Sequence, residues 1–100
     1  MRYDKLVRDR IPEIIAKRGE KAVTHVADEA EYWTLLKRKL QEEAAEFVRD
    51  ESVGEIADVL EVVRAICAFR GFDMAEIERV RAKKAEERGG FSGRIVLDES

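Results

Sequence analysis

The chain has 100 residues, of which 45% are hydrophobic and 41% are charged, and its formal net charge is −3. This length predicts one domain with a real but modest core. The 19 basic residues are balanced by 22 acidic ones, so the chain lacks the basic excess typical of nucleic-acid binding, and we expect no nucleic-acid partner.

The chain also lacks the patterns of a membrane or exported protein. Its apolar runs are only a few residues long, which excludes a transmembrane span. The opening stretch MRYDKLVRDR has no apolar segment of the signal-peptide kind. Cys67 is the single cysteine and can form no internal disulfide. We therefore expect a cytoplasmic protein without membrane association.

The first part of the chain predicts one short helix and one short strand. Pro12 suits the first turn of a helix over residues 11–18, and Gly19 suits its end. Residues 21–26, KAVTHV, combine alternation with β-branched residues, which favours a strand.

The middle of the chain predicts two long helices. Asp28 is a suitable N-cap for a helix that runs to about Arg49. Ser52, with Glu55 three residues later, makes a capping box for the next helix, which should end at Gly71.

The last part predicts a fourth helix and a second strand. Asp73 and Glu76 repeat the capping box, and the helix should run to Arg88, just before two glycines. Residues 94–98, RIVLD, read as a short strand that could pair with residues 21–26. The predicted fold is therefore mostly α, an antiparallel bundle of about four helices with two short strands.

The two long helices should form an antiparallel hairpin joined around residues 50–52, each with one apolar stripe along it. On the first, the stripe is Trp33, Leu36, Leu40, Ala44 and Phe47. On the second, it is Ile56, Val59, Leu60, Val63, Ile66 and Cys67.

Four acids accompany these stripes as two pairs. A helix turns about 100° per residue, so Glu43 falls roughly 50° from the centre of its stripe, and Glu46 lies on the same flank one turn on. Glu55 falls inside the second stripe, and Asp58 lies at its edge. Each pair is spaced i, i+3, and the hairpin is short enough for the two pairs to face each other.

Four convergent carboxylates would repel one another unless cations intervene. Mg²⁺ prefers oxygen ligands and keeps several waters, and those open positions suit a phosphate chain. A purely structural interpretation also exists for each acid. Glu55 could serve only as the capping-box residue, and Glu42 and Glu43 could pair with Lys39 on a helix surface.

The stretch KLQEEAAEF followed by GEIADVLEVV resembles the all-α nucleoside triphosphate pyrophosphohydrolases, the MazG-like superfamily. That family carries an E-x-x-E pair on one helix and an E-x-x-D pair on the next. The flanks YDKLVRDRIPEII and KKAEERGGFSGRIVL are similar to a small single-domain subgroup labelled phosphoribosyl-ATP pyrophosphohydrolase-like. The likeness thus spans nearly the whole chain, and we expect residues 1–100 to form one MazG-like domain. Only eight residues separate the two acid pairs, fewer than in many members.

The resemblance implies a Mg²⁺-dependent hydrolase, for which Mn²⁺ could substitute, that cleaves the α–β phosphate bond of a nucleoside triphosphate. The products would be a nucleoside monophosphate and pyrophosphate. By the same comparison the metal ligands would be Glu43, Glu46, Glu55 and Asp58. Either Glu42 or Glu43 would orient the attacking water. The resemblance also implies a homodimer or a higher homo-oligomer.

A triphosphate needs basic partners as well. The candidates for substrate binding are Arg8, Arg10, Lys39, Lys84 and Arg88, with Lys5 and Lys83 beside them. The basic residues at the end of the fourth helix could equally complement its dipole.

Several alternatives remain open at the level of the sequence. The substrate could be free nucleotides in a housekeeping role, which we favour, or phosphoribosyl-ATP of histidine biosynthesis. A non-catalytic helical binding module would use the same hairpin for association. We expect a structural role for His25 and a buried one for Cys67, and we expect Tyr32 and Trp33 to be core or dimer contacts, with base stacking as the alternative.

Overall fold

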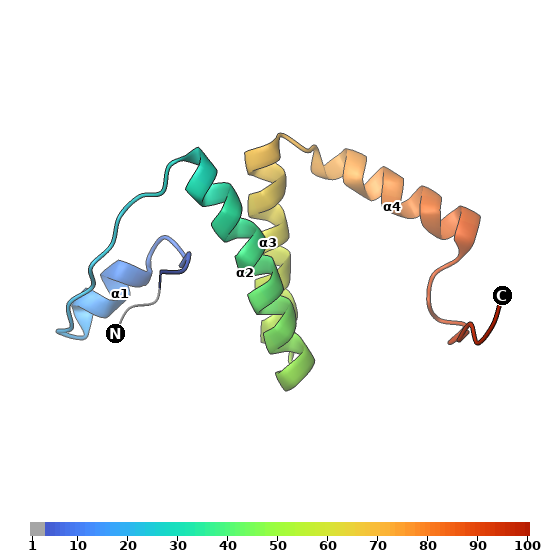
Figure 1. The fold of residues 1–100 in the computed structure, drawn as a ribbon, viewed down its shortest axis with the longest axis horizontal. Helices are drawn as coiled ribbons and strands as arrows, with labels where there is room; N and C mark the ends of the chain where they lie inside the picture. Colours follow the sequence, from blue (N-terminus) through green and yellow to red (C-terminus); the bar gives the residue numbers. More distant parts are fainter. Residues whose placement is uncertain (1–3) are drawn as a thin grey trace.

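The computed structural model describes residues 4–100, and within this range it contains four α-helices (Figure 1). Their bounds are Ile11–Lys17 (α1), Glu29–Asp50 (α2), Val53–Arg70 (α3) and Met74–Arg88 (α4). The predicted all-α class is confirmed. None of these four helices combines the length and the apolar character needed to cross a membrane.

The four helices begin where the sequence indicated, and their ends agree with the predicted ones to within one residue. Asp28 and Ser52 each accept a hydrogen bond from the backbone N–H three residues later, at 2.8 Å and 3.2 Å. Asp73 accepts one from the N–H two residues later, at 3.0 Å. Gly71 ends α3 in the left-handed conformation, with φ of 71°, as a C-cap glycine commonly does.

The two predicted strands are wrong, because residues 21–26 and 94–98 form no regular secondary structure. A strand exists only through hydrogen bonds to a neighbour, and an isolated pair of strands is marginal in water. Here the first segment lies beside α1 and the second lies beyond α4, at opposite ends of the molecule (Figure 1). The β-branched residues therefore stay exposed, and Val26 retains 97% of its accessible surface.

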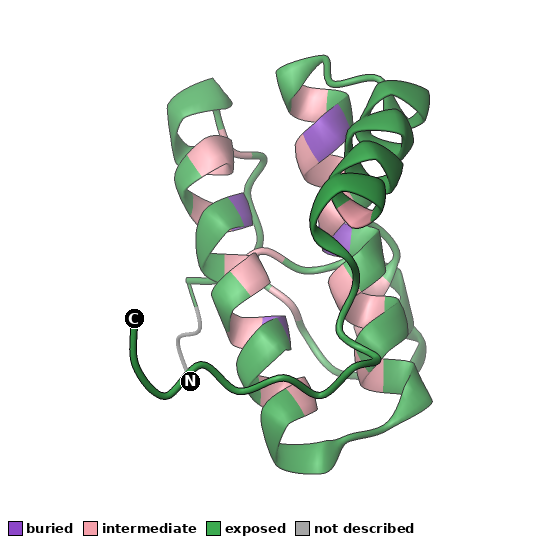
Figure 2. Ribbon diagram, turned by 90° about the vertical axis from the view of Figure 1, so that its right-hand side faces the viewer, coloured by how far each residue is buried: buried purple, intermediate pink, exposed green. Residues whose placement is uncertain are grey.

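The packed centre of the chain is the antiparallel hairpin of α2 and α3. The fully buried positions of the described chain all lie on these two helices (Figure 2), and their apolar members are Leu36, Val62 and Cys67. The chain reverses within two residues because Glu51 takes the left-handed conformation, with φ of 52°.

The buried face of α3 differs from the predicted stripe. Val62 is buried although it lay outside that stripe, whereas Leu60 lay inside it and is 58% exposed, and Ile56 is also exposed. The cause is that α3 is apolar around most of its circumference, so periodicity alone leaves the face that meets α2 undefined.

An aromatic cluster closes the open end of the hairpin, opposite the bend. Phe69 contacts Tyr32 edge-on at 5.2 Å between ring centroids and stacks on Trp33 at 5.8 Å. The Arg70 guanidinium lies over the Trp33 ring at 5.0 Å. Tyr32 and Trp33 thus serve as packing contacts between the helices.

The last part of the chain extends away from this hairpin, as Figure 1 shows for α4. The molecule measures 55 × 31 × 24 Å and its radius of gyration is 17.7 Å. A compact domain of this length has a radius of gyration of about 13 Å. One copy of the chain is therefore an open arrangement around a two-helix centre.

Candidate metal centre

Three carboxylates from two helices meet inside the hairpin near its bend. Glu43 of α2 and Glu55 and Asp58 of α3 each offer one oxygen, and these oxygens lie within 4.8 Å of one another. The convergence of acids across the hairpin, expected from the sequence, is present for these three. Glu46 is not in this group, although it lies close enough to Glu43 to affect its pKa.

Local structure explains this placement. The Ser52 cap starts α3 so that Glu55 and Asp58 occupy its first two turns on adjacent positions of one face. Glu43 lies two turns before the end of α2, and the two-residue reversal after that end brings the helices back at the same level.

Two of the carboxylate oxygens in this cluster are buried without a partner. Within residues 4–100, neither Glu43 Oε2 nor Glu55 Oε2 has a hydrogen-bond partner, and Glu43 is only 6% exposed. Most buried polar atoms in proteins are bonded, and an unsatisfied one costs about 1–3 kcal/mol. These two oxygens are therefore the atoms of the cluster whose burial a bound cation would most directly compensate.

Burial raises the pKa of the Glu43 carboxyl above its ordinary value. The Lys39 ammonium, 3.2 Å from Glu43 Oε1, opposes this shift, and the neighbouring Glu46 adds to it. The negative charge of Glu43 is thus disfavoured in this position, and a bound cation would relieve that cost.

The capping-box interpretation of Glu55 accounts for its backbone only. Its N–H donates to Ser52 Oγ at 3.2 Å. In the described part of the chain, the Glu55 carboxylate returns no hydrogen bond to the Ser52 backbone, and one of its oxygens is buried in the cluster instead. The side chain is therefore available as a ligand.

Three predicted basic residues lie beside the acids. Arg8 Nη2 donates to Asp58 Oδ1 at 2.7 Å, and Lys5 Nζ lies 3.4 Å from Glu42 Oε1. Lys39 Nζ lies between Glu43 and Glu42, at 3.2 Å and 3.9 Å. The segment before α1 therefore covers one side of the acidic cluster with positive charge. The contact between Arg8 and Asp58 joins residues 50 positions apart, so no local sequence signal could have indicated it.

The other predicted basic residues lie elsewhere. Arg10 makes no ion pair with an acid among residues 4–100. Lys84 and Arg88 lie on α4, which leads away from the hairpin (Figure 1), and Lys83 pairs with Glu87 at 3.9 Å. One copy of the chain does not bring the α4 residues to the acids.

His25 has a partner that the sequence reasoning missed. Its Nε2 lies 3.0 Å from both carboxylate oxygens of Glu31, and both residues are exposed. Glu31 lies in the first turn of α2, where its N–H donates to the Asp28 cap. This pair lies outside the acidic cluster.

Comparison with known proteins adds one partial match. The chain is 51% identical over 41 residues to an uncharacterized protein of Mycolicibacterium smegmatis. The match covers 41% of this chain and 42% of that protein, so the chain spans less than half of the relative's length. No protein-family model matches the chain, and no solved structure matches it.

Proposed function

We propose that this protein is a Mg²⁺-dependent nucleotide pyrophosphohydrolase. It would cleave the α–β bond of a free nucleoside triphosphate to a monophosphate and pyrophosphate, in a housekeeping role. The observation that supports this most strongly is the pair of buried, unpartnered oxygens of Glu43 and Glu55 within a three-carboxylate cluster. The sequence resemblance to the MazG-like superfamily supports the same reaction.

The donor atoms suit a hard divalent cation. The clustered ligands are all carboxylate oxygens, which Mg²⁺ and Mn²⁺ accept, and no cysteine or histidine belongs to the group. Glu43, Glu55 and Asp58 would hold the ion, and Glu46, one turn beyond Glu43, supplies a further carboxylate.

A bound Mg²⁺ would neutralise phosphate charge and lower the pKa of a coordinated water. The side chains of the protein would accept a proton from the water and bind the phosphate oxygens. Glu42 is half-buried at the edge of the cluster and can accept a proton from a water on that side. Arg8 and Lys5 are exposed enough to exchange a carboxylate for a phosphate oxygen, and the Arg8 guanidinium fits two such oxygens at once.

We also infer that the protein assembles as a homodimer or a higher homo-oligomer. One copy exposes 9044 Å². A compact monomer of 11.5 kDa exposes about 5,800 Å². α3 is apolar around most of its circumference, which is typical of a helix that other helices cover on several sides. Within one copy, α2 covers only one side of α3.

The test is hydrolysis of a nucleotide panel with Mg²⁺, with the products identified. The panel contains standard, deoxy and damaged triphosphates together with phosphoribosyl-ATP, and Glu43→Gln and Asp58→Asn serve as inactive controls. Monophosphate plus pyrophosphate, lost in both controls, is the expected result. Hydrolysis of phosphoribosyl-ATP alone would assign the histidine-pathway reaction. A folded protein that neither binds Mg²⁺ nor hydrolyses any substrate would overturn the proposal in favour of a helical binding module.

A further inference from the structure

The segment before α1 contacts both helices of the hairpin at the acidic cluster. We call residues 4–10 the N-terminal strap. Lys5 Nζ lies 3.4 Å from Glu42 Oε1 on α2, and Arg8 Nη2 donates to Asp58 Oδ1 on α3 at 2.7 Å. Two cations that lie three residues apart in the sequence thus tie one short segment to both helices.

These two contacts differ from the other ion pairs of the molecule. Within residues 4–100, every other ion pair joins residues no more than six positions apart. The contacts of the strap span 37 and 50 positions. Pairs between near neighbours on a helix need only the right spacing. A pair across 50 positions requires that the strap itself lies against the hairpin.

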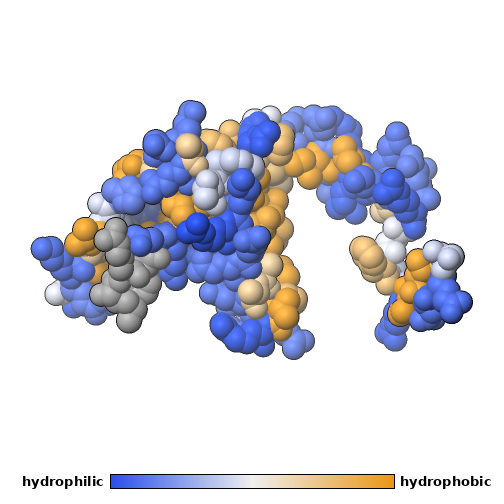
Figure 3. All heavy atoms as spheres, in the orientation of Figure 1, coloured by the Kyte–Doolittle hydropathy of each residue, from blue (hydrophilic) through white to orange (hydrophobic). Residues whose placement is uncertain are grey.

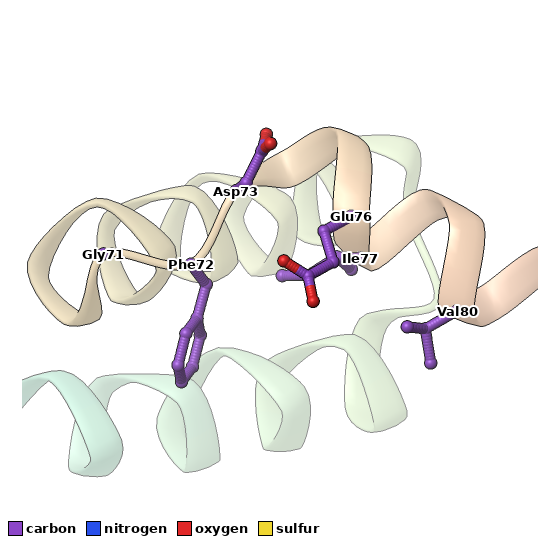
Figure 4. A pocket seen from close by; sticks show the side chains of 6 residues that line it. All are labelled: Gly71, Phe72, Asp73, Glu76, Ile77 and Val80. Carbon is purple, nitrogen blue, oxygen red and sulfur yellow. The ribbon is translucent and has the colours of Figure 1, made fainter.

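Acids elsewhere on the surface hold no such segment. Figure 4 shows Glu76 beside a hollow of about 260 Å³ at the corner between α3 and α4, together with the apolar side chains of Phe72, Ile77 and Val80. Glu76 forms no ion pair with a cation among residues 4–100. An exposed acid alone therefore does not bring a distant cation to it, whereas the acidic cluster does.

The strap is held mainly by its ion pairs. All its residues are exposed except Leu6, which is half-buried. Figure 3 shows hydrophilic residues on the side of the hairpin near the beginning of the chain and apolar residues along the opposite flank. The Arg8 side chain is 57% exposed and that of Asp58 is 39% exposed, and exposed ion pairs are individually weak. The strap can therefore detach without disturbing the buried core.

Arg8 and a divalent cation would compete for the same carboxylate. Asp58 accepts the hydrogen bond of Arg8 and also supplies one of the three clustered oxygens. The acids attract both cations, whereas the two cations repel each other, and this repulsion sets the sign of their coupling. Lys5 acts in the same sense from farther away, since its partner Glu42 precedes Glu43 at the edge of the cluster.

Such a coupling between two sites is reciprocal. If the strap weakens metal binding by some factor, a bound metal weakens the attachment of the strap by the same factor. Coupled sites typically change one another's affinity by about 5-fold to 150-fold. Because both ion pairs of the strap are exposed, we expect the lower end of this range.

We propose that the N-terminal strap covers the acidic cluster through Arg8 and Lys5, and that a bound divalent cation releases it. The cation would be held by Glu43, Glu55 and Asp58. Release opens this side of the cluster to a ligand only when the metal is bound. The inference rests on the metal site of the proposed function and not on the hydrolysis that we propose there.

Calorimetric titration with Mn²⁺, without nucleotide, tests the effect of the strap on the metal. Arg8→Gln removes the contact to Asp58, and the affinity for Mn²⁺ should rise about fivefold. Lys5→Gln should raise it less, because Glu42 is not one of the three clustered acids. Arg10→Gln is the matched control, since it removes the same charge from the same segment. Among residues 4–100, Arg10 forms no ion pair with an acid, so this variant should keep the wild-type affinity.

The effect of the metal on the strap is measured by EPR spectroscopy. A nitroxide label is placed on Asp9→Cys in a Cys67→Ala background, because Asp9 is exposed and adjoins Arg8. Saturating Mg²⁺, which is diamagnetic, should increase the mobile share of the spectrum. Addition of Arg8→Gln should make the label mobile without Mg²⁺. The same label on Arg79→Cys in α4 is the control and should not respond to Mg²⁺.

The outcomes separate the strap from the enzyme. If the protein binds metal but the label does not become more mobile, the strap proposal is overturned and the pyrophosphohydrolase is not. The same holds if Arg8→Gln leaves the Mn²⁺ affinity unchanged or lowers it, and a lower affinity would make Arg8 a residue that positions Asp58 for the metal. Release of the strap by Mg²⁺ in a protein that hydrolyses no nucleotide would support the strap and overturn the reaction. A protein that binds neither Mg²⁺ nor Mn²⁺ would overturn both.

Discussion

The hairpin and the C-terminal arm, residues 71–100, contain the same local helix signals but differ in how much surface they bury within one copy. Both contain helices with side-chain N-caps, and α3 and α4 each end at a glycine with positive φ. Only the hairpin buries side chains, and the arm leaves almost all of its residues exposed. Capping therefore sets where a helix begins and ends, whereas tertiary packing supplies most of its stability.

The two regions also differ in how they hold charge. The arm keeps its charged residues in solvent or in exposed pairs such as Lys83 with Glu87. The hairpin buries Glu43 and leaves an oxygen of Glu43 and one of Glu55 without a partner. Such a cost in the only well-packed part of the described chain is typical of a functional site rather than of a structural one.

The largest expected effect is found by comparing a buried residue of the hairpin with an exposed apolar residue of the arm. Leu36 is 1% exposed, so Leu36→Ala should lower the free energy of unfolding by about 2–5 kcal/mol through lost burial and a cavity. Val80 in the arm is half exposed, and Val80→Ala should cost under about 1 kcal/mol within an isolated copy.

Urea denaturation at several protein concentrations measures both changes. If residues 71–100 take part in the proposed homo-oligomer, the effect of Val80→Ala should grow with protein concentration. Equal effects of both substitutions at low concentration would contradict the contrast between the two regions.

Glu43→Gln should separate function from stability. It removes a buried carboxylate, so Mg²⁺ binding should be lost, and the hydrolysis rate should fall at least about 100-fold, or about 3 kcal/mol. Without metal, the variant should unfold no more easily than the wild type, because a costly buried charge is gone.

Calorimetric Mg²⁺ titration, turnover and thermal unfolding in chelator test these three expectations. Glu61→Gln, on the exposed side of α3, is the matched control and should change none of them. A strongly destabilised Glu43→Gln variant would indicate that the Glu43 carboxylate stabilises the fold and does not serve to bind a cation.

The pH dependence of stability should follow from the same residue. Since burial raises the pKa of the Glu43 carboxyl, its contribution to metal-free stability is complete below about pH 4.3, the usual value for glutamate, and is lost as the pH rises through the raised pKa. The melting temperature in chelator, relative to Glu43→Gln, should therefore fall with rising pH.

Saturating Mg²⁺ should reverse this trend, because a cation binds the deprotonated carboxylate. Besides burial, Lys39 lowers the pKa of Glu43 and Glu46 raises it, and Glu55 and Asp58 lie across from Glu43 on α3. The prediction would be contradicted if the difference in melting temperature between the wild type and Glu43→Gln stayed constant from pH 4 to pH 8, both with and without Mg²⁺.

The smallest expected effect concerns the junction between the two regions. Gly71 has φ of 71°, and a Cβ there would meet no atom within 4 Å, so Gly71→Ala should cost only the backbone strain of about 1–2 kcal/mol. Gly90 also has open space and no positive φ, and Gly90→Ala should be close to neutral. The melting temperatures of the two variants check this prediction. A decrease for Gly71→Ala alone would indicate backbone strain at the corner between α3 and α4, whereas equal decreases for both variants would contradict it.

The fold could be predicted where its causes are local. Asp28, Ser52 and Asp73 act on N–H groups two or three residues away, so their caps are visible in the sequence and agree with the structure. The strands were wrong because strand formation depends on a neighbour that residues 21–26 and 94–98 do not have. The same reason explains Val62, whose burial depends on which face of an all-round apolar helix meets α2.

The acidic site likewise has features that helical spacing determines and features that only the packing of the helices determines. Helical spacing by itself determined that Glu55 and Asp58 share a face and that Glu43 approaches the apolar stripe, because 3.6 residues per turn is a property of any helix. Only the tertiary structure decided that Glu43 and Glu55 bury oxygens without partners and that Arg8 covers Asp58. Such contacts join segments far apart in the chain, and they follow from how the helices pack rather than from any local pattern.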